Sequence, residues 1–281
     1  MPTRPGPTVQ RRRLGLELRR LREQAGKTID DVAEILECSD SKISRIEHGQ
    51  VGATPRDVRD MLDFYGVAPE RRDELVDVAR AARKKRWWEA YGDTLVVPMV
   101  GLEVAADRIH AYEPMAVHGL LQTREYAEAM IRAERPDLPP DQVDRWVQLR
   151  MTRQQLFDQE DAPTFDVVLE ECALRRPVGG RNALRSQLEH LVESATLPNL
   201  TLQVLPLAVG EHAAMSGAFM IYRFSGLLDP DVVYLEHTTS DLYLETPEQV
   251  DRYVAAFDRL QAAALSPSDS SSMLAALLRE V

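Results

Sequence analysis

The chain has 281 residues, of which 44% are hydrophobic and 28% charged, a composition typical of soluble globular proteins. This length suffices for two domains with buried cores. No apolar run reaches the roughly 20 residues of a membrane-spanning helix, and the N-terminal MPTRPGPTVQRRR lacks the apolar centre of a signal peptide. The composition therefore excludes the membrane-spanning class, and we expect a cytoplasmic protein that has no membrane partner.

The net charge of −11 is unevenly distributed. The first 86 residues hold 19 Lys or Arg and 15 Asp or Glu, whereas the remaining residues hold 15 and 30, which gives +4 and −15. This asymmetry predicts two domains, residues 1–86 and 87–281, of which only the first binds a polyanion.

The two cysteines, Cys38 and Cys172, lie far apart and form no CxxC or Cys/His pattern. The spacing therefore indicates neither a disulfide framework nor a structural zinc site. We expect both to be reduced and buried, and no metal or cofactor site is predicted.

Helical periodicity and capping residues mark five short helices in the first domain. Thr28 and Asp31 form the pattern of a capping box, Ser39 and Thr54 stand at helix-capping positions, and Pro55 follows at the first position of its helix. Glycines stand where three of the helices should end: Gly26, Gly49 and Gly66. The predicted helices are 11–25, 29–36, 40–48, 55–65 and 69–85.

The third of these helices lies within CSDSKISRIEHG, residues 38–49, and is unusually polar. Ile43 and Ile46 can face a core, while serine, lysine, arginine, aspartate and histidine side chains occupy the rest of the helix. A helix this short is not stable alone, so neighbouring helices must hold it. Because two or three residues join it to the second helix, the pair fits the helix-turn-helix pattern, whose second helix enters the major groove of DNA.

The stretch 11–67 resembles the Cro/cI-like helix-turn-helix family, also called the xenobiotic-response-element family, in LRRLREQAGKTIDDVAEIL, CSDSKISRIEHG and TPRDVRDMLDFYGV. The resemblance implies a DNA-binding transcriptional regulator and a structural pair between Arg22 and Glu47. Family members often have a phosphate-contacting glutamine where this chain has Ile29, so Thr28, Lys27 or the arginines at 11–13 are expected to contact phosphate instead. The resemblance places six further residues at or beside the DNA: Ser39, Asp40, Ser41, Lys42, Ser44 and Arg45.

Other interpretations of these residues remain open. A generic helical bundle with a solvated serine face would also explain the polarity. Arg45 could form a surface ion pair, and Asp40 either accepts from a cytosine amino group or limits nonspecific binding. The cations of RKKRWW, residues 83–88, could bind phosphates, but cations also stabilise a helix C-terminus. Paired tryptophans often pack between two domains, and we favour this interpretation of the segment.

Beyond Gly92 the pattern predicts an α+β domain with a small, mostly antiparallel sheet, because several of the links between apolar runs are short. LEVAADRIHAY begins as a helix, and YEPMAVHGLLQT is predicted as an extended stretch. Predicted helices include REYAEAMIRAE, PPDQVDRWVQLRMTRQQLFD, NALRSQLEHLVESA and TPEQVDRYVAAFDRLQAAAL. The predicted strands are TFDVVLEE, TLQVLPL, GAFMIYRF, DVVYLEH and LYLE.

From Trp88 onward the sequence resembles the uncharacterised domain that follows such a DNA-binding head in many actinobacterial regulators. The matching phrases include YEPMAVHGLLQTREYA, EECALRRPVGG, LPNLTLQVLPL and GEHAAMSGAFMIYRF. The resemblance implies a small partner protein encoded by a neighbouring gene, in an arrangement compared with antitoxin and toxin pairs.

Candidate chemistry in the second domain consists of carboxylates, histidines, one arginine and the hydroxyl of Ser216, four residues after His212. The motifs HExxH, GxSxG, GxGxxG and GxxxxGK are absent, so we expect no enzyme. A surface for a partner or ligand is predicted instead, formed with the Gly217 loop by four residues: His118, Glu171, Arg175 and His212.

Together these features predict a sequence-specific, nucleoid-associated transcriptional regulator that binds double-stranded DNA. A homodimer would read a two-fold operator with half-sites about 10 base pairs apart. The alternative is an antitoxin-like protein that sequesters a small neighbouring gene product and uses DNA binding for autoregulation.

Overall fold

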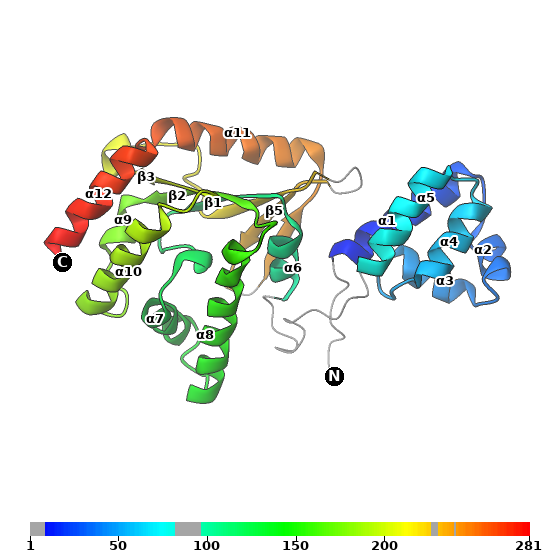
Figure 1. Cartoon of the computed structure of the whole chain (residues 1–281), viewed down its shortest axis with the longest axis horizontal. Helices are drawn as coiled ribbons and strands as arrows, with labels where there is room; N and C mark the ends of the chain where they lie inside the picture. The colour runs from blue at the N-terminus through cyan, green and yellow to red at the C-terminus, as the bar shows by residue number, and fades with distance from the viewer. Residues whose placement is uncertain (1–8, 82–96, 226–229, 239) are drawn as a thin grey trace. The chain divides into compact units, whose positions relative to one another are not determined.

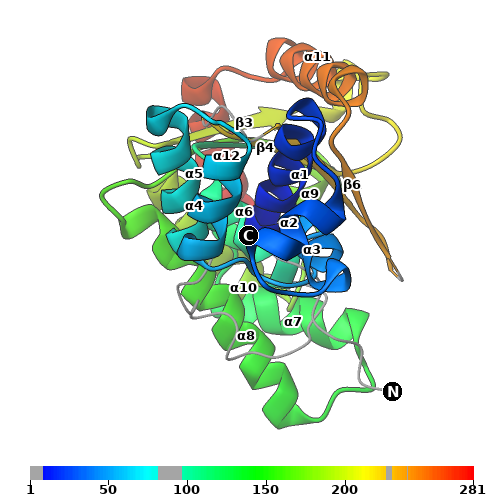
Figure 2. The same cartoon turned by 90° about the vertical axis from the view of Figure 1, so that its right-hand side faces the viewer.

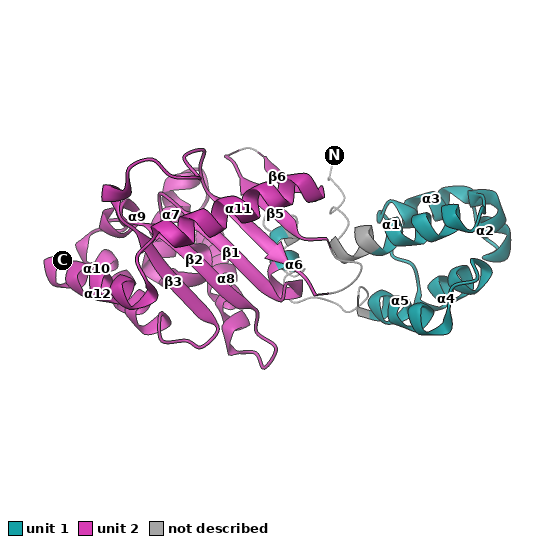
Figure 3. Cartoon of the chain, turned by 90° about the horizontal axis from the view of Figure 1, so that it is seen from above, with its two compact units in different colours: residues 1–102, 226–229 teal, residues 103–225, 230–281 magenta. Residues whose placement is uncertain are grey.

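The computed structural model of the chain describes residues 9–81, 97–225, 230–238 and 240–281 (Figure 1). They form two compact units that divide between Leu102 and Glu103 (Figure 3). The domain boundary predicted at residues 86 and 87, and the RKKRWW segment, lie outside the described residues. Within the described part of the chain, no helix has both the length and the apolar character needed to cross a membrane.

The described part of unit 1 begins with the five predicted helices (Figure 2). The predicted capping box of Thr28 with Asp31 opens the second helix, and the fourth helix opens with a further capping box, Thr54 with Asp57, that was not predicted. The predicted terminal glycines at 26, 49 and 66 have φ values of 66°, 68° and 73°, a conformation that glycine adopts without strain. The helices are α1 (Val9–Gln24), α2 (Ile29–Ile35), α3 (Asp40–Glu47), α4 (Pro55–Phe64) and α5 (Pro69–Ala81).

Gly15 lets α1 approach the last turn of α3 directly. A Cβ atom placed on Gly15 would lie 2.4 Å from the carbonyl oxygen of Ile46 and 2.6 Å from that of Glu47. Both distances are far shorter than a carbon–oxygen contact, and backbone atoms cannot move aside as a flexible side chain can. A glycine inside a helix costs about 1 kcal/mol relative to alanine, and here that cost is explained by packing.

The Gly15→Ala variant is expected to lower the free energy of unfolding of unit 1 by about 1–3 kcal/mol, because α1 and α3 must separate to admit the methyl group. Urea denaturation followed by circular dichroism measures the change. Leu16→Ala is the matched control, since Leu16 lies on the same helix and is 52% exposed. A Gly15→Ala protein as stable as the wild type would show that the helices do not pack as described.

Unit 2 contains a six-stranded sheet in the order β3-β2-β1-β4-β5-β6. The strands are β1 (Arg108–Glu113), β2 (Thr164–Glu170), β3 (Leu200–Leu205), β4 (Phe219–Arg223), β5 (Val232–Glu236) and β6 (Asp241–Leu244). The α-helices outside unit 1's bundle are α6 (Val97–Ala105), which crosses the division between the units, α7 (Arg124–Glu134), α8 (Pro140–Gln154), α9 (Glu171–Arg175), α10 (Arg181–Ser194), α11 (Pro247–Ala263) and α12 (Pro267–Glu280). Short 3-10 turns are η2 (Gly119–Leu121), η3 (Gln155–Asp158) and η4 (Leu207–Val209).

The α+β class is confirmed, but the predicted sheet is corrected in two respects: it has six strands and is not small, and it is mixed, with two parallel pairings beside three antiparallel ones. β1 pairs with β2, and β2 with β3, in parallel, while β1–β4, β4–β5 and β5–β6 are antiparallel. The central strand β1 was missed because its polar residues Arg108, His110 and Glu113 break the apolar signal and the preceding helical pattern runs into it. Without β1, the crossover through α7 and α8 had no first strand, although the predicted helix between β2 and β3 already offered one parallel crossover.

Helices cover both faces of the sheet. Figure 1 shows α11 across one face and α7, α8 and α10 on the other. Phe257 and Leu260 of α11 share a core with Ile221 and Val233 of the sheet. Strand β3 lies at one edge, where α12 protects it because the Ser270 hydroxyl accepts a hydrogen bond from the Val204 N–H at 2.9 Å.

Candidate nucleic-acid interface

Helix α3 has one face in the core of unit 1 and one face in solvent. Ile43 and Ile46 are 0% and 2% exposed and belong to the core cluster of the unit. The predicted DNA-contacting side chains occupy the rest of the helix and its N-terminal flank. Four are exposed, Ser39, Asp40, Ser41 and Arg45, and two are half-buried, Lys42 and Ser44. The structure therefore brings the six predicted residues together on one short segment.

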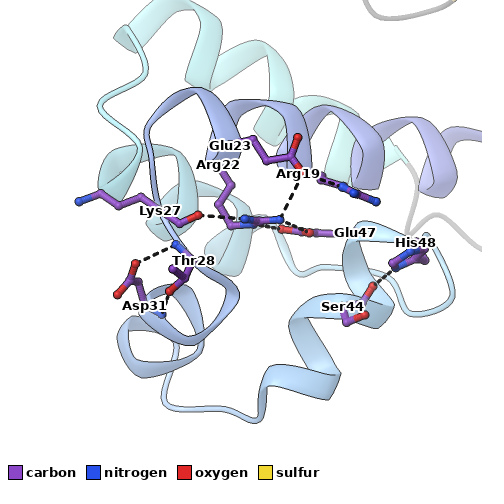
Figure 4. Close-up of polar contacts among 9 residues, drawn as sticks. All are labelled: Arg19, Arg22, Glu23, Lys27, Thr28, Asp31, Ser44, Glu47 and His48. Atoms are coloured by element: carbon purple, nitrogen blue, oxygen red, sulfur yellow. Dashed lines mark hydrogen bonds and ion pairs between the residues drawn. The ribbon is translucent and has the colours of Figure 1, made fainter.

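A buried ion pair fixes the C-terminal end of α3 to α1 (Figure 4). The Arg22 guanidinium donates through Nε to Glu47 Oε1 at 2.7 Å and through Nη2 to Oε2 at 3.0 Å. A third bond from Nη1 reaches the Lys27 carbonyl at 2.9 Å, and the hydrogen bonds that Arg22 donates to Glu47 raise the pKa of Arg22. Glu47 is 2% exposed, so its interpretation as a structural partner is confirmed.

Arg45 is the exposed guanidinium of α3. Its Nε donates to the Ser41 carbonyl at 3.1 Å, one turn earlier on the same helix. Its terminal Nη groups make no hydrogen bond to any described residue, so the planar fork remains available. Such a fork matches the O6 and N7 acceptors of guanine and also the oxygens of a phosphate.

Lys42 is held away from full solvent exposure by α4. Its Nζ lies 3.7 Å from Asp57 Oδ2, and Asp57 also closes the capping box of α4. The Lys42 side chain is 37% exposed, and surface pairs of this kind contribute at most about 1 kcal/mol. A phosphate can therefore compete with Asp57 for this ammonium group.

Ser39 occupies the N-cap position of α3, but the predicted side-chain cap is wrong. Its hydroxyl forms no bond to the helix N–H groups and lies 3.1 Å from the Ser41 hydroxyl. The Ser39 carbonyl begins the helix by accepting from the N–H groups of Lys42 and Ile43 at 2.8 and 3.3 Å. The hydroxyls of Ser39 and Ser41 thus lie at the exposed start of α3, and the Ser39 hydroxyl does not cap the helix.

The residues expected to replace the phosphate-contacting glutamine have local roles. Thr28 is exposed, and its hydroxyl accepts from the Asp31 N–H at 3.1 Å. The Lys27 ammonium lies 4.5 Å from the centre of the Phe64 ring, a cation–π distance. Ile29 is half-buried against the core, and the side chains of residues 11–13 lie outside the described set.

His48 is a further exposed polar side chain at the end of α3, which the predicted site omitted. Its Nδ1 lies 2.7 Å from the Ser44 carbonyl, and because a carbonyl only accepts, the proton belongs on Nδ1. The neutral ring then presents Nε2 as an acceptor. The polar side chains of CSDSKISRIEHG, which include His48, were the sequence signal that could have identified it.

The four residues predicted to form a partner or ligand surface in unit 2 are not brought to one place. Adjacent residues of a strand point to opposite faces of its sheet, and on β1 Tyr112 contacts His212 whereas Glu113 lies near His118. His212 therefore belongs to the α11 face and His118 to the opposite face.

His212 belongs to a hydrogen-bonded group centred on Glu170. Its Nε2 lies 3.1 Å from Glu170 Oε1, the oxygen that also accepts from the Tyr112 hydroxyl. The Cys172 thiol lies 3.7 Å from Oε2, and burial together with Glu170 raises the pKa of this thiol. Because His212 Nδ1 accepts from the Ala214 N–H at 3.3 Å, the proton is on Nε2 and points at Glu170.

Glu171 and Arg175 form an ion pair on α9. Arg175 Nε donates to Glu171 Oε1 at 2.7 Å, and its Nη1 donates to Glu280 of α12 at 2.9 Å. The second carboxylate oxygen of Glu171 accepts from the Leu207 N–H at 3.1 Å. Their contacts connect α9 with α12 and with η4.

His118 is 2% exposed and lies between Met220 and Phe165. Burial, with Arg153 and Arg150 nearby, lowers the pKa of His118 to about 3, so the ring is neutral at ordinary pH. Its Nδ1 accepts from the Leu120 N–H at 3.2 Å. The neighbouring Glu113, 3.9 Å from His118 Nε2, has its pKa raised to about 8 by burial and by Glu236, against the opposing effect of Arg150.

Glu113 is expected to make unit 2 less stable at high pH. A carboxyl whose folded pKa is above its unfolded value stabilises the fold while it is protonated, and this contribution disappears as the pH rises from about 4.5 to 8. In Glu113→Gln the side chain stays neutral, so the free energy of unfolding of the variant minus that of the wild type should increase between pH 5 and pH 9. Urea denaturation across this range measures the difference, and a pH-independent difference would contradict the assignment.

Comparison with known families follows the division of the chain. The model described as "Domain of unknown function (DUF5753)" matches residues 96–276, and the one described as "Helix-turn-helix domain" matches residues 13–75. Searches of curated proteins and of solved structures gave no match. The helix-turn-helix match contains α2 and α3 in full and supports a DNA-binding regulator.

Proposed function

The chain belongs to the DUF5753 family and carries a helix-turn-helix domain before that domain, and from this premise we propose that it is a sequence-specific DNA-binding transcriptional regulator of the Cro/cI-like type. The observation that carries the proposal is the split character of α3. Two isoleucines hold the helix in the core, and the exposed Arg45 guanidinium faces solvent with the hydroxyls of Ser39 and Ser41.

In this proposal α3 lies in the major groove. The Arg45 fork donates to guanine, while the hydroxyls of Ser39 and Ser41 donate to or accept from nearby base edges or phosphates. Lys42 exchanges Asp57 for a phosphate. The −15 charge of residues 87–281 supports restricting the polyanion to unit 1.

The Arg45→Ala variant is expected to lose about 1–3 kcal/mol of binding free energy on a preferred site and to lose preference at one base position. Fluorescence anisotropy on the preferred duplex and on its single-base variants measures both. Arg80→Ala is the control, because Arg80 is an exposed arginine of α5 paired with Asp77 and should leave affinity almost unchanged. An equal loss on every sequence would instead assign Arg45 to phosphate.

For residues 87–281 we propose homodimerisation and binding of a small partner protein encoded by a neighbouring gene, without catalysis. The acidic charge favours a basic partner, and the same feature favours the antitoxin-like alternative in which sequestration is the main task. Co-purification with the neighbouring gene product tests this part. Absence of a complex at micromolar concentration would remove partner binding and leave the DNA-binding proposal intact.

A further inference from the structure

The connection from β3 to β4, residues 206–218, runs along the end of the sheet at which β1, β2 and β3 finish and β4 begins. β3 and β4 lie on opposite sides of the β1–β2 pair, and they meet this connection at the end where β1 and β2 finish. The chain therefore passes over the carboxyl ends of β2 and β1, with η4 as a 3-10 turn and a second turn at residues 213–216.

Three contacts bring this connection and the loop after β1 to one corner, at residues 170–172. His212 lies 3.1 Å from Glu170, and the Leu207 N–H donates to Glu171 at 3.1 Å. From the other loop, the Pro114 carbonyl accepts from the Cys172 thiol at 2.7 Å. Side chains that follow these contact points are therefore neighbours on one part of the surface.

Apolar side chains are exposed around this corner. Met215 is 69% exposed, and Leu207 and Met115 are each 57% exposed. We define the crossover surface as these three residues with the exposed alanines of the same connection: Met115, Leu207, Ala208, Ala213, Met215 and Ala218. An exposed apolar patch indicates an interaction site, and methionine side chains adapt well to a partner.

Charge is almost missing from the crossover connection. Glu211 is the one Asp, Glu, Lys or Arg among residues 206–218, in a chain where these residues make up 28%. At the corner beside the connection, Glu171 and Glu280 both pair with Arg175, so a basic partner would find its main attraction in the carboxylates elsewhere in residues 87–281. The connection instead suits a partner that must avoid like-charge repulsion.

We propose that the crossover surface is the interface for a second copy of this chain, packed about a two-fold axis. In such an interface the same surface of each subunit contacts that of the other. A charged residue near the axis would therefore lie close to the identical residue of the second subunit and be repelled by it. Two segments of charge −15 can approach most easily through a charge-poor apolar face. The inference rests on the homodimer of the proposed function and names the surface that forms it.

Light scattering coupled to size-exclusion chromatography tests the interface on the full chain. The wild type should show twice the chain mass of 31.7 kDa at micromolar concentration. Leu207→Glu with Met215→Glu should raise the dimer dissociation constant at least about a hundredfold, because four carboxylates would enter the interface. The control is Leu242→Glu, on β6 and 48% exposed, which should leave the dimer intact.

The milder pair Leu207→Ala with Met215→Ala should raise the same constant about tenfold, and it replaces the glutamate pair if that variant does not fold. A wild type that is monomeric at about 50 µM, or a glutamate pair that stays dimeric, would overturn the inference. If the variants at Leu207 and Met215 stay dimeric but no longer bind the product of the neighbouring gene, the inference is also overturned. The surface would then bind that protein and not a second copy of the chain. DNA binding is measured separately, so a dimer without DNA binding would contradict the proposed regulator and leave this interface standing.

Discussion

Replacing Glu47 with alanine is expected to lower the free energy of unfolding of unit 1 by about 3–5 kcal/mol and to abolish specific DNA binding. The variant leaves the Arg22 guanidinium without its carboxylate, and Arg22 is 8% exposed. In the wild type, the attraction of Glu47 offsets the free-energy cost of removing the Arg22 charge from water. In the variant that desolvation cost remains and the attraction is lost, so the variant loses more stability than the intact pair contributes. The last turn of α3 also loses its connection to α1.

Urea denaturation and DNA anisotropy measure the two effects of Glu47→Ala. Asp77→Ala is the matched control, because Asp77 pairs with Arg80 on the exposed surface of α5 and should change stability by less than about 0.5 kcal/mol. Replacing both Arg22 and Glu47 with leucine should recover much of the stability, since no buried charge remains. A Glu47→Ala protein as stable as the wild type would contradict the buried ion pair between Arg22 and Glu47.

Arg153→Ala is expected to have an effect of similar size in unit 2. Arg153 donates to Glu103 through Nε at 2.9 Å and through Nη2 at 2.6 Å, and the two residues are 6% and 2% exposed. Removing the guanidinium leaves the Glu103 carboxylate buried and unpaired, which should cost about 3–5 kcal/mol. The control is Arg132→Ala, which removes an exposed pair with Glu128 on α7.

Hydrogen exchange distinguishes the two buried pairs, because each unit has its own core. Arg153→Ala should reduce protection in the sheet of unit 2 and leave α3 protected, and Glu47→Ala should do the reverse. Loss of protection in α3 caused by Arg153→Ala would show that the two units do not unfold independently.

Unit 1 was predictable because its signals are local. Thr28 with Asp31, Thr54 with Pro55, and the glycines at 26, 49 and 66 each act within one helical turn. The exception is Gly15, whose role depends on the backbone carbonyls of Ile46 and Glu47, far along the chain. A glycine in the middle of a helical pattern signals close packing, but it does not say against which helix.

Unit 2 was less predictable because its order depends on contacts between distant residues. β1 carries a weak local strand signal and is recognisable only from its neighbours β2 and β4. Similarly, the structure pairs His212 with Glu170, which was not among the predicted surface residues, while Glu171 accepts from the Leu207 N–H. The residue types of these clusters could be read from the sequence, but their partners could not.

The central claim is that α3 reads DNA sequence, and selection from a random duplex library by the full-length protein tests it most directly. We expect an enriched motif whose affinity exceeds that for random duplex by about a thousandfold or more at physiological salt, and whose information content falls in the Arg45→Ala protein. A wild-type protein that enriches no sequence, or binds every duplex equally, would contradict the account.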